Sequence, residues 1–127
     1  MASDKRLNGK VMIITGSGSG FGRAGAIRFA AEGAKVVVAD INMAGAEETV
    51  RLIQQAGGEA IAVKCNVAKA EDVQAMVEAA TAAYGRLDGI WNNAGIQGET
   101  AQDIAHCPVD MIDRYVDIDI KGVWYGC

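Results

Sequence analysis

Two short stretches of the sequence, residues 10–15 and 35–40, consist mainly of consecutive apolar residues and read KVMIIT and KVVVAD. A strand with one face in water alternates apolar and polar residues, whereas a continuous apolar run needs cover on both of its faces. Strands of that kind are typical of parallel sheets. The two runs therefore predict neighbouring strands of a parallel sheet with helices packed on both sides.

Helical patterns alternate with the β-rich runs along the chain. Three segments carry apolar side chains at helical spacing and end before a glycine: residues 21–32, 44–56 and 71–84, before Gly33, Gly57 and Gly85. Two more β-rich runs complete a βαβαβαβ order: residues 60–64 and 87–92. Because crossover connections are nearly always right-handed, we expect a doubly wound α/β sheet with strand order 3-2-1-4 and a crevice between strands 1 and 4.

The last segment, residues 109–127, follows Pro108, and its pattern predicts one more helix with the proline in its first turn. Asp117 and Lys121 are spaced to pair weakly on the wet side of this helix. Asp119 lies instead on the apolar stripe, where a carboxylate normally needs a partner. We therefore single out Asp119 as a candidate functional residue.

A glycine-rich turn, TGSGSGFG over residues 15–22, joins the first strand to the first helix. Glycines permit the positive φ of a tight turn and let the backbone approach a pyrophosphate, while the helix N-terminus offers free N–H groups. We predict a dinucleotide cradle set by three glycines: Gly16, Gly20 and Gly22. Three other residues of the turn are predicted as cofactor contacts: Ser17, Ser19 and Phe21. Gly25, which completes a literal G-x-G-x-x-G pattern, is interpreted as a small packing residue.

Asp40 ends the second apolar run. A carboxylate there can accept hydrogen bonds from the adenosine ribose hydroxyls and would repel a 2′-phosphate. It is followed by Ile41 and Asn42 rather than by an arginine. This pattern favours NAD over NADP, with Asp40 and Ile41 at the adenosine end of the cofactor. A solvated acid at a strand end is the alternative interpretation.

A second motif, N-N-A-G over residues 92–95, accompanies the glycine turn. Together, T-G-x-x-x-G-x-G and N-N-A-G resemble the short-chain dehydrogenase/reductase (SDR) family over residues 9–127. The resemblance implies a Rossmann-type doubly wound parallel sheet in three α/β/α layers, a nicotinamide cofactor, and hydride exchange between a secondary alcohol and a ketone. It also implies a homodimer or homotetramer for the complete protein. Further cofactor contacts follow from it: Asn66 and Val67 beside the adenine, and Asn93, Ala94 and Gly95 along the cleft.

Catalysis in the SDR family depends on a Tyr-x-x-x-Lys motif, which this sequence does not contain. The family's catalytic Asn-x-x-Gly segment matches residues 119–122, with Asp119 in place of the asparagine. We interpret Asp119 as a catalytic-site residue, with a paired structural acid as the alternative. Residues 96–99 are expected to border a small alcohol or ketone substrate.

The resemblance thus implies that residues 1–127 are the NAD-binding Rossmann portion of a single short-chain dehydrogenase domain. The fold would be incomplete at the C-terminus, and this portion alone would be inactive. Two alternatives stay open: a non-catalytic NAD-binding module and an S-adenosylmethionine methyltransferase, which also uses a glycine turn and an acid after its second strand.

Charge and cysteine content narrow the partners. The net charge of −4 and the acidic pI disfavour binding to nucleic acid or to an anionic membrane. No window approaches ~18 consecutive apolar residues, and the N-terminus lacks a signal-like stretch, so a cytoplasmic location is expected. The three cysteines are far apart, and neither C-x-x-C nor H-E-x-x-H occurs, which predicts neither a disulfide framework nor a metal site.

Overall fold

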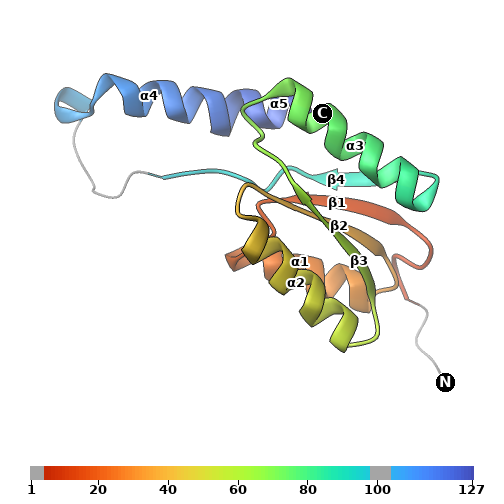
Figure 1. Ribbon diagram of the computed structural model, residues 1–127. Coiled ribbons are helices and arrows are strands. Elements are labelled where there is room, and N and C mark those ends of the chain that lie inside the picture. The colour runs from red at the N-terminus through yellow and green to blue at the C-terminus, as the bar shows by residue number, and fades with distance from the viewer. Residues whose placement is uncertain (1–4, 98–103) are drawn as a thin grey trace.

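The computed structural model describes residues 5–97 and 104–127, in which it shows a four-stranded parallel sheet (Figure 1). Its strands are β1 Val11–Thr15, β2 Lys35–Asp40, β3 Glu59–Lys64 and β4 Gly89–Trp91. They lie in the order β3-β2-β1-β4, so that β1 pairs with β2 on one side and with β4 on the other. The predicted strand order and the doubly wound α/β class are confirmed.

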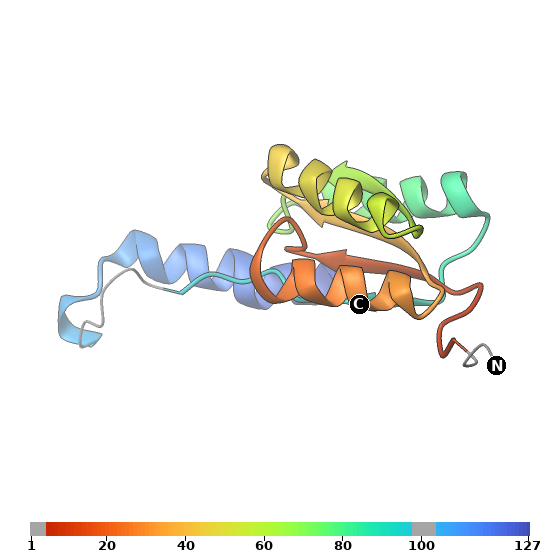
Figure 2. The same cartoon turned by 90° about the horizontal axis from the view of Figure 1, so that it is seen from below.

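Helices cover both faces of the sheet and complete three layers (Figures 1 and 2). One face carries two helices: α1 Gly20–Ala31 and α2 Met43–Gln55. The other face carries α3, Ala70–Tyr84, and the end of a final helical run. After the 3₁₀ turn η1, Ile104–His106, that run comprises α4 Val109–Tyr115, the π-helix η2 Val116–Lys121 and α5 Gly122–Gly126.

Successive strand residues point to opposite faces of the sheet and so build two apolar cores. The core beneath α3 contains buried residues of the strands and of the helix: Ile13, Val37, Val73, Met76 and Ala80. The core beneath α1 and α2 contains the alternate strand residues with small or branched helical ones: Ile14, Val36, Val38, Ala26 and Ile53. Because both faces are covered, the loops at the carboxyl ends of the strands are where a ligand can reach the sheet.

Strand β4 is shorter than the predicted run over residues 87–92. Asp88, just before the strand, accepts the Val11 N–H with its carboxylate at 2.9 Å, and its own N–H donates to the Val11 carbonyl at 2.9 Å. After the strand, the Asn93 N–H turns back to the Trp91 carbonyl at 2.9 Å. The observed strand is therefore shorter at both ends. A side-chain hydrogen bond occupies the residue before it, and a tight turn begins directly after it.

The final helical run differs from the single α-helix predicted over residues 109–127. Pro108 is the N-cap residue, with φ −60° and ψ 142°, rather than a residue of the first turn. The π-helix adds a residue to each of its turns and so breaks the spacing on which the predicted apolar stripe depended. Asp117 and Lys121 pair as expected, at 3.3 Å. The run projects beyond the sheet (Figures 1 and 2), and its Trp124 is 77% exposed.

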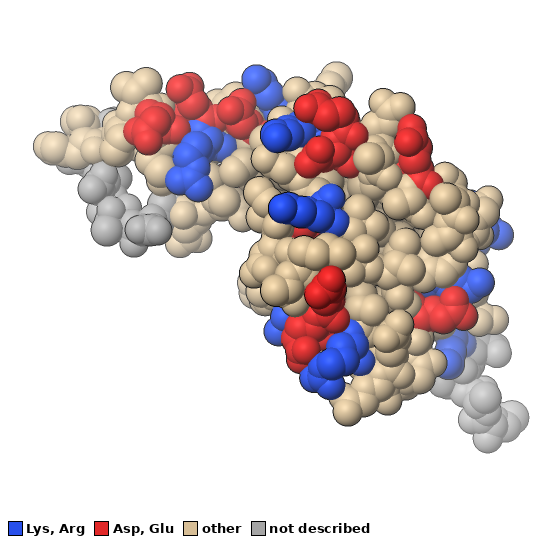
Figure 3. All heavy atoms as spheres, viewed as in Figure 1, with Lys and Arg blue, Asp and Glu red and all other residues tan. Residues whose placement is uncertain are grey.

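Charged side chains of both signs are mixed over the face of the molecule drawn in Figure 3. Local ion pairs join Arg51 to Glu48 at 2.7 Å and Arg28 to Glu32 at 2.7 Å. Among the described helices, none combines the length and the apolar character that crossing a bilayer requires. Residues 5–97 and 104–127 also hold no group of three or more His, Cys, Asp or Glu side chains arranged to bind a metal ion.

Candidate functional site

The carboxyl ends of the strands open into a cavity of about 270 Å³. It lies where the strand order reverses, which is the usual ligand site of a doubly wound sheet. Most of its lining consists of predicted cofactor residues: Gly16, Ser19, Asp40, Ile41, Asn66, Val67, Asn93, Ala94 and Gly95. Ile96, expected beside the substrate, also lines the cavity, together with two residues that were not predicted there, Cys65 and Ile118. Gly98 and Glu99 lie outside the described residues.

The glycine turn has the geometry that its sequence predicted. Gly16 and Gly20 have φ of 67° and 55°, a region that other residues rarely adopt. A Cβ on Gly16 would lie 2.9 Å from the Ala94 Cα, and one on Gly22 would overlap the Gly16 carbonyl oxygen. Ser19 is the N-cap of α1, and its side chain makes no capping hydrogen bond. The first N–H groups of α1 therefore stay available to an anion.

Four predicted contacts of the turn do not line the cavity: Ser17, Gly20, Phe21 and Gly22. Ser17 is fully buried, and its hydroxyl donates to the Ile14 carbonyl at 2.6 Å, so that side chain faces the protein interior. The Phe21 side chain is 86% exposed. Gly25 has the predicted packing role, because a Cβ there would overlap the Trp91 ring.

Asp40 is half-buried at the rim of the cavity, and backbone N–H groups hold both of its carboxylate oxygens. Oδ2 accepts the Gly18 N–H at 2.8 Å, and Oδ1 accepts the Asn42 N–H at 2.9 Å. Each oxygen has a second lone pair that can accept a hydrogen bond from a ligand. The carboxylate is therefore oriented before any ligand binds.

Asn93 and Thr15 tie the loop after β4 to the glycine turn. The Asn93 Nδ2 donates to the carbonyls of Thr15 and Gly16 at 3.1 and 3.4 Å. The Thr15 hydroxyl accepts the Ala94 N–H at 3.0 Å. Sequence reasoning placed Asn93 here but missed Thr15, although a polar residue closing an apolar strand run was a signal for it. These bonds fix one wall of the cavity across two chain segments.

Asn66 and Cys65 follow β3 and form the opposite wall. The Asn66 Oδ1 accepts the Ala68 N–H at 3.0 Å, and the Asn66 N–H donates to the Asp72 carboxylate at 3.0 Å, so the turn is held by its own residues. Burial, together with the smaller effect of the nearby Asp72 charge, raises the pKa of Cys65 to about 11. At neutral pH the thiol is therefore protonated, and it does not supply a thiolate nucleophile.

Asp119 lies in the π-helix η2, and its carboxylate has the kind of partner expected from the sequence. Its Oδ1 accepts the Ile96 N–H at 2.8 Å. The same oxygen is close to Gly95, since a Cβ added to Gly95 would lie 3.3 Å from it. The carboxylate thus holds the loop that follows N-N-A-G. This geometry is compatible with both interpretations of Asp119, a catalytic-site residue and a paired structural acid.

Comparison with known proteins adds independent evidence. A family model described as short chain dehydrogenase matches residues 10–127. The chain is 40% identical to cyclohexanol dehydrogenase of Acinetobacter sp. (strain SE19) over 121 residues, which cover 95% of this chain and 48% of that enzyme. It is 43% identical to 3beta-hydroxysteroid dehydrogenase 1 of Eggerthella lenta over 123 residues, covering 95% of this chain and 46% of that enzyme.

Among solved structures, 3-ketoacyl-(acyl-carrier-protein) reductase from Brucella melitensis, complexed with NADH, matches with a TM-score of 0.87 and 44% identity. That match covers 94% of this chain and 48% of the reductase. The chain thus spans about half the length of the relatives it matches. With the family model matching nearly the whole sequence and the fold and motifs in agreement, the chain belongs to the short-chain dehydrogenase family.

Proposed function

We propose that the cavity binds NAD and that this chain provides the cofactor-binding part of a short-chain dehydrogenase. The observation that carries the proposal is Asp40, whose carboxylate is fixed at the cavity rim by two backbone N–H groups. Such a carboxylate suits the two hydroxyls of an adenosine ribose and would repel a 2′-phosphate. The glycine turn fits the same ligand, because side chains at Gly16 and Gly22 would displace backbone atoms of the cradle.

The start of α1 would bind the pyrophosphate. The first-turn N–H groups of Gly20, Phe21 and Gly22 are the donors in this proposal, since intrahelical bonding does not use them. Gly20 and Phe21 would therefore act through their backbone, which agrees with a Phe21 side chain that points into solvent. Ser19 and Gly16 would border the same phosphates from the cavity lining.

The two walls of the cavity would hold the ends of the cofactor. Asn66 and Val67 would border the adenine, with Ile41 beside Asp40 at the adenosine end. Asn93, Ala94 and Gly95 would line the path toward the nicotinamide, which when bound supplies the ring that accepts or donates a hydride. The hydrogen bonds from Asn93 and to Thr15 would keep that path in place.

In the whole protein, the reaction would be the interconversion of a secondary alcohol and a ketone of small molecular size. Asp119 would position the substrate side of the site by holding the Ile96 N–H. Because no Tyr-x-x-x-Lys motif is present in residues 1–127, we expect this part to bind the cofactor without catalysing turnover. A homodimer or homotetramer in the cytoplasm, without a nucleic-acid or membrane partner, completes the proposal.

Cofactor titration tests it. We expect NADH to bind, with an accompanying change in its fluorescence, and NADPH to bind more weakly. Asp40→Asn keeps the shape of the side chain but removes its charge, and should bring the two affinities closer together. Asp113→Asn, an exposed acid on α4, is the matched control and should leave the preference unchanged. Equal or tighter binding of NADPH would contradict the NAD assignment, and preferential binding of S-adenosylmethionine would favour the methyltransferase alternative.

A further inference from the structure

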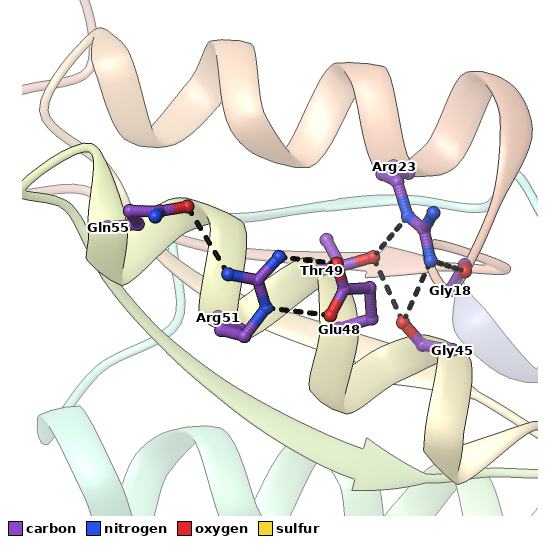
Figure 4. A network of polar contacts seen from close by, with 7 residues as sticks. All are labelled: Gly18, Arg23, Gly45, Glu48, Thr49, Arg51 and Gln55. Carbon is purple, nitrogen blue, oxygen red and sulfur yellow. Dashed lines mark hydrogen bonds and ion pairs between the residues drawn. The ribbon is translucent and has the colours of Figure 1, made fainter.

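Arg23, near the start of α1, extends its guanidinium group between α1 and α2 (Figure 4). Its Nη2 donates to the Gly18 carbonyl at 2.6 Å and to the Gly45 carbonyl at 3.3 Å. Its Nε donates to the Thr49 hydroxyl at 3.0 Å. One planar donor group thus joins the glycine turn to α2, a geometry that the point charge of a lysine cannot reproduce.

Thr49 holds the same turn from α2. It is fully buried, and its hydroxyl donates to the Ser17 carbonyl at 2.8 Å. Gly45 allows the close approach of α2, because a Cβ there would lie 2.7 Å from the Gly18 carbonyl oxygen. Arg23 and Thr49 therefore hold the carbonyl groups of two consecutive residues in the turn.

The other side of Gly18 faces Asp40. The Gly18 N–H donates to Asp40 Oδ2 at 2.8 Å, and a Cβ on Gly18 would lie 2.8 Å from that same oxygen. A glycine imposes little conformational preference of its own, so the direction of this N–H depends on what holds the residue. The strongest hold on its carbonyl is the Arg23 contact at 2.6 Å.

We propose that Arg23 is a positioning residue for cofactor selection: by fixing Gly18, it fixes the Asp40 carboxylate that distinguishes a 2′-hydroxyl from a 2′-phosphate. This inference rests on the proposed function, in which the cavity binds NAD. Arg23 acts through Gly18 and Asp40, because its Nε and Nη2 donors are directed at protein groups. Without the planar donor group of Arg23, the Gly18 N–H is no longer held toward Oδ2, and Asp40 keeps only the Asn42 N–H on Oδ1. The ribose diol then meets a less aligned acceptor, and a 2′-phosphate meets a less directed charge.

Two substitutions of Arg23 and one matched control test the proposal in the full chain. Arg23→Met keeps the apolar stem and removes every donor, and Arg23→Lys keeps the charge but not the planar arrangement. Arg51→Met is the control: Arg51 lies on α2, contacts Glu48 at 2.7 Å and Gln55 at 3.3 Å, and does not contact the turn (Figure 4). The readouts are the dissociation constants of NADH and NADPH, and the hydrogen exchange of the Gly18 amide measured by NMR without cofactor.

We expect Arg23→Met to speed exchange at Gly18 and to weaken NADH binding by about five- to tenfold, the effect of losing hydrogen bonds worth about 1 kcal/mol. NADPH binding should change by less than about twofold, so the preference narrows. Arg23→Lys should fall between the wild type and Arg23→Met, and it carries the comparison if the methionine variant does not fold. Arg51→Met should behave as the wild type in all three measurements.

Other outcomes overturn the proposal and identify the reason. An equal loss of affinity for NADH and NADPH would assign Arg23 a general structural role. The same conclusion would follow if exchange at Gly18 became faster while the preference for NADH over NADPH stayed unchanged. Unchanged exchange at Gly18 would show that Arg23 does not hold the turn. A wild-type chain that binds neither NADH nor NADPH would refute the proposed function. It would also refute the role of Arg23 in cofactor selection, regardless of the hydrogen exchange measured at Gly18.

Discussion

Replacing Gly22 with alanine tests how closely α1 packs on the glycine turn. Alanine favours a helix interior by about 1 kcal/mol over glycine, so in an open helix the change would stabilise the protein. At position 22 the new Cβ would overlap the Gly16 carbonyl oxygen. It would also lie 2.7 Å from the Asn93 Nδ2, where 3.4–4 Å is ordinary contact.

Two energetic costs oppose the stability that alanine would add through its higher helix propensity. Moving α1 or the turn to relieve the overlap costs roughly 1–3 kcal/mol, as in other overpacked sites. Displacing Asn93 weakens its bonds to the Thr15 and Gly16 carbonyls, which costs about 1 kcal/mol more. We therefore expect the free energy of unfolding to fall by roughly 1–3 kcal/mol, which for a domain of this size lowers the Tm by roughly 4–12 °C.

Urea unfolding followed by tryptophan fluorescence and circular dichroism measures this change. Ala24→Gly is the matched reference, because Ala24 is an exposed residue of the same helix and reports the alanine–glycine difference alone. That variant should lose about 1 kcal/mol. If Gly22→Ala gained the amount of stability that Ala24→Gly loses, the close contact with the turn would be refuted.

Three further predictions concern the cores and their titratable groups. Met76→Ala should lower the free energy of unfolding by roughly 2–5 kcal/mol, because Met76 is fully buried; urea unfolding measures this, and a loss below about 1 kcal/mol would contradict the packing. Cys65 should resist iodoacetamide at pH 8 while exposed Cys127 reacts, and equal labelling of both thiols would argue against burial of Cys65. Because the pKa of Cys65 rises from 9.0 to about 11 on folding, the free energy of unfolding should fall as pH rises through that interval. Arg86 and the Val11 N–H lower the pKa of Asp88, so its contribution to stability should be lost as pH falls through the folded value, and Asp88→Asn should flatten the acid side of a stability–pH curve; an unchanged curve would exclude this role.

The fold was predictable because its signals are local. Continuous apolar runs gave the buried strands, and glycines such as Gly33 and Gly85, with φ of 93° and 77°, ended helices where predicted. The cavity followed from the same reasoning, since the residues at the ends of parallel strands meet at one edge of the sheet. Asp40 and Asn93, which end two of these strands or follow them, both line the cavity.

The parts that sequence reasoning missed depend on contacts between distant residues. Arg23 and Thr15 are ordinary helical and strand residues in the sequence, and only the packed structure brings their side chains to the turn and to the loop after β4. The π-helix was not predictable either, because adding a residue to each turn alters neither the amino-acid composition nor a periodic pattern that the sequence would show. Ser17 was predicted at the ligand because it lies in the turn, but the direction of its hydroxyl follows from the Ile14 carbonyl beneath it.

The central position of β1 in the sheet bears on how the chain folds. β1 reaches β2 through one short crossover, so that pairing can form while synthesis continues. Its other edge stays open until Gly89 pairs with Met12, a contact between distant parts of the chain that closes slowly. Until then, the apolar residues of Val11–Thr15 present unpaired backbone groups to any neighbouring chain. A nascent or heat-stressed molecule is therefore prone to aggregate through β1, a strand that the finished sheet pairs on both edges.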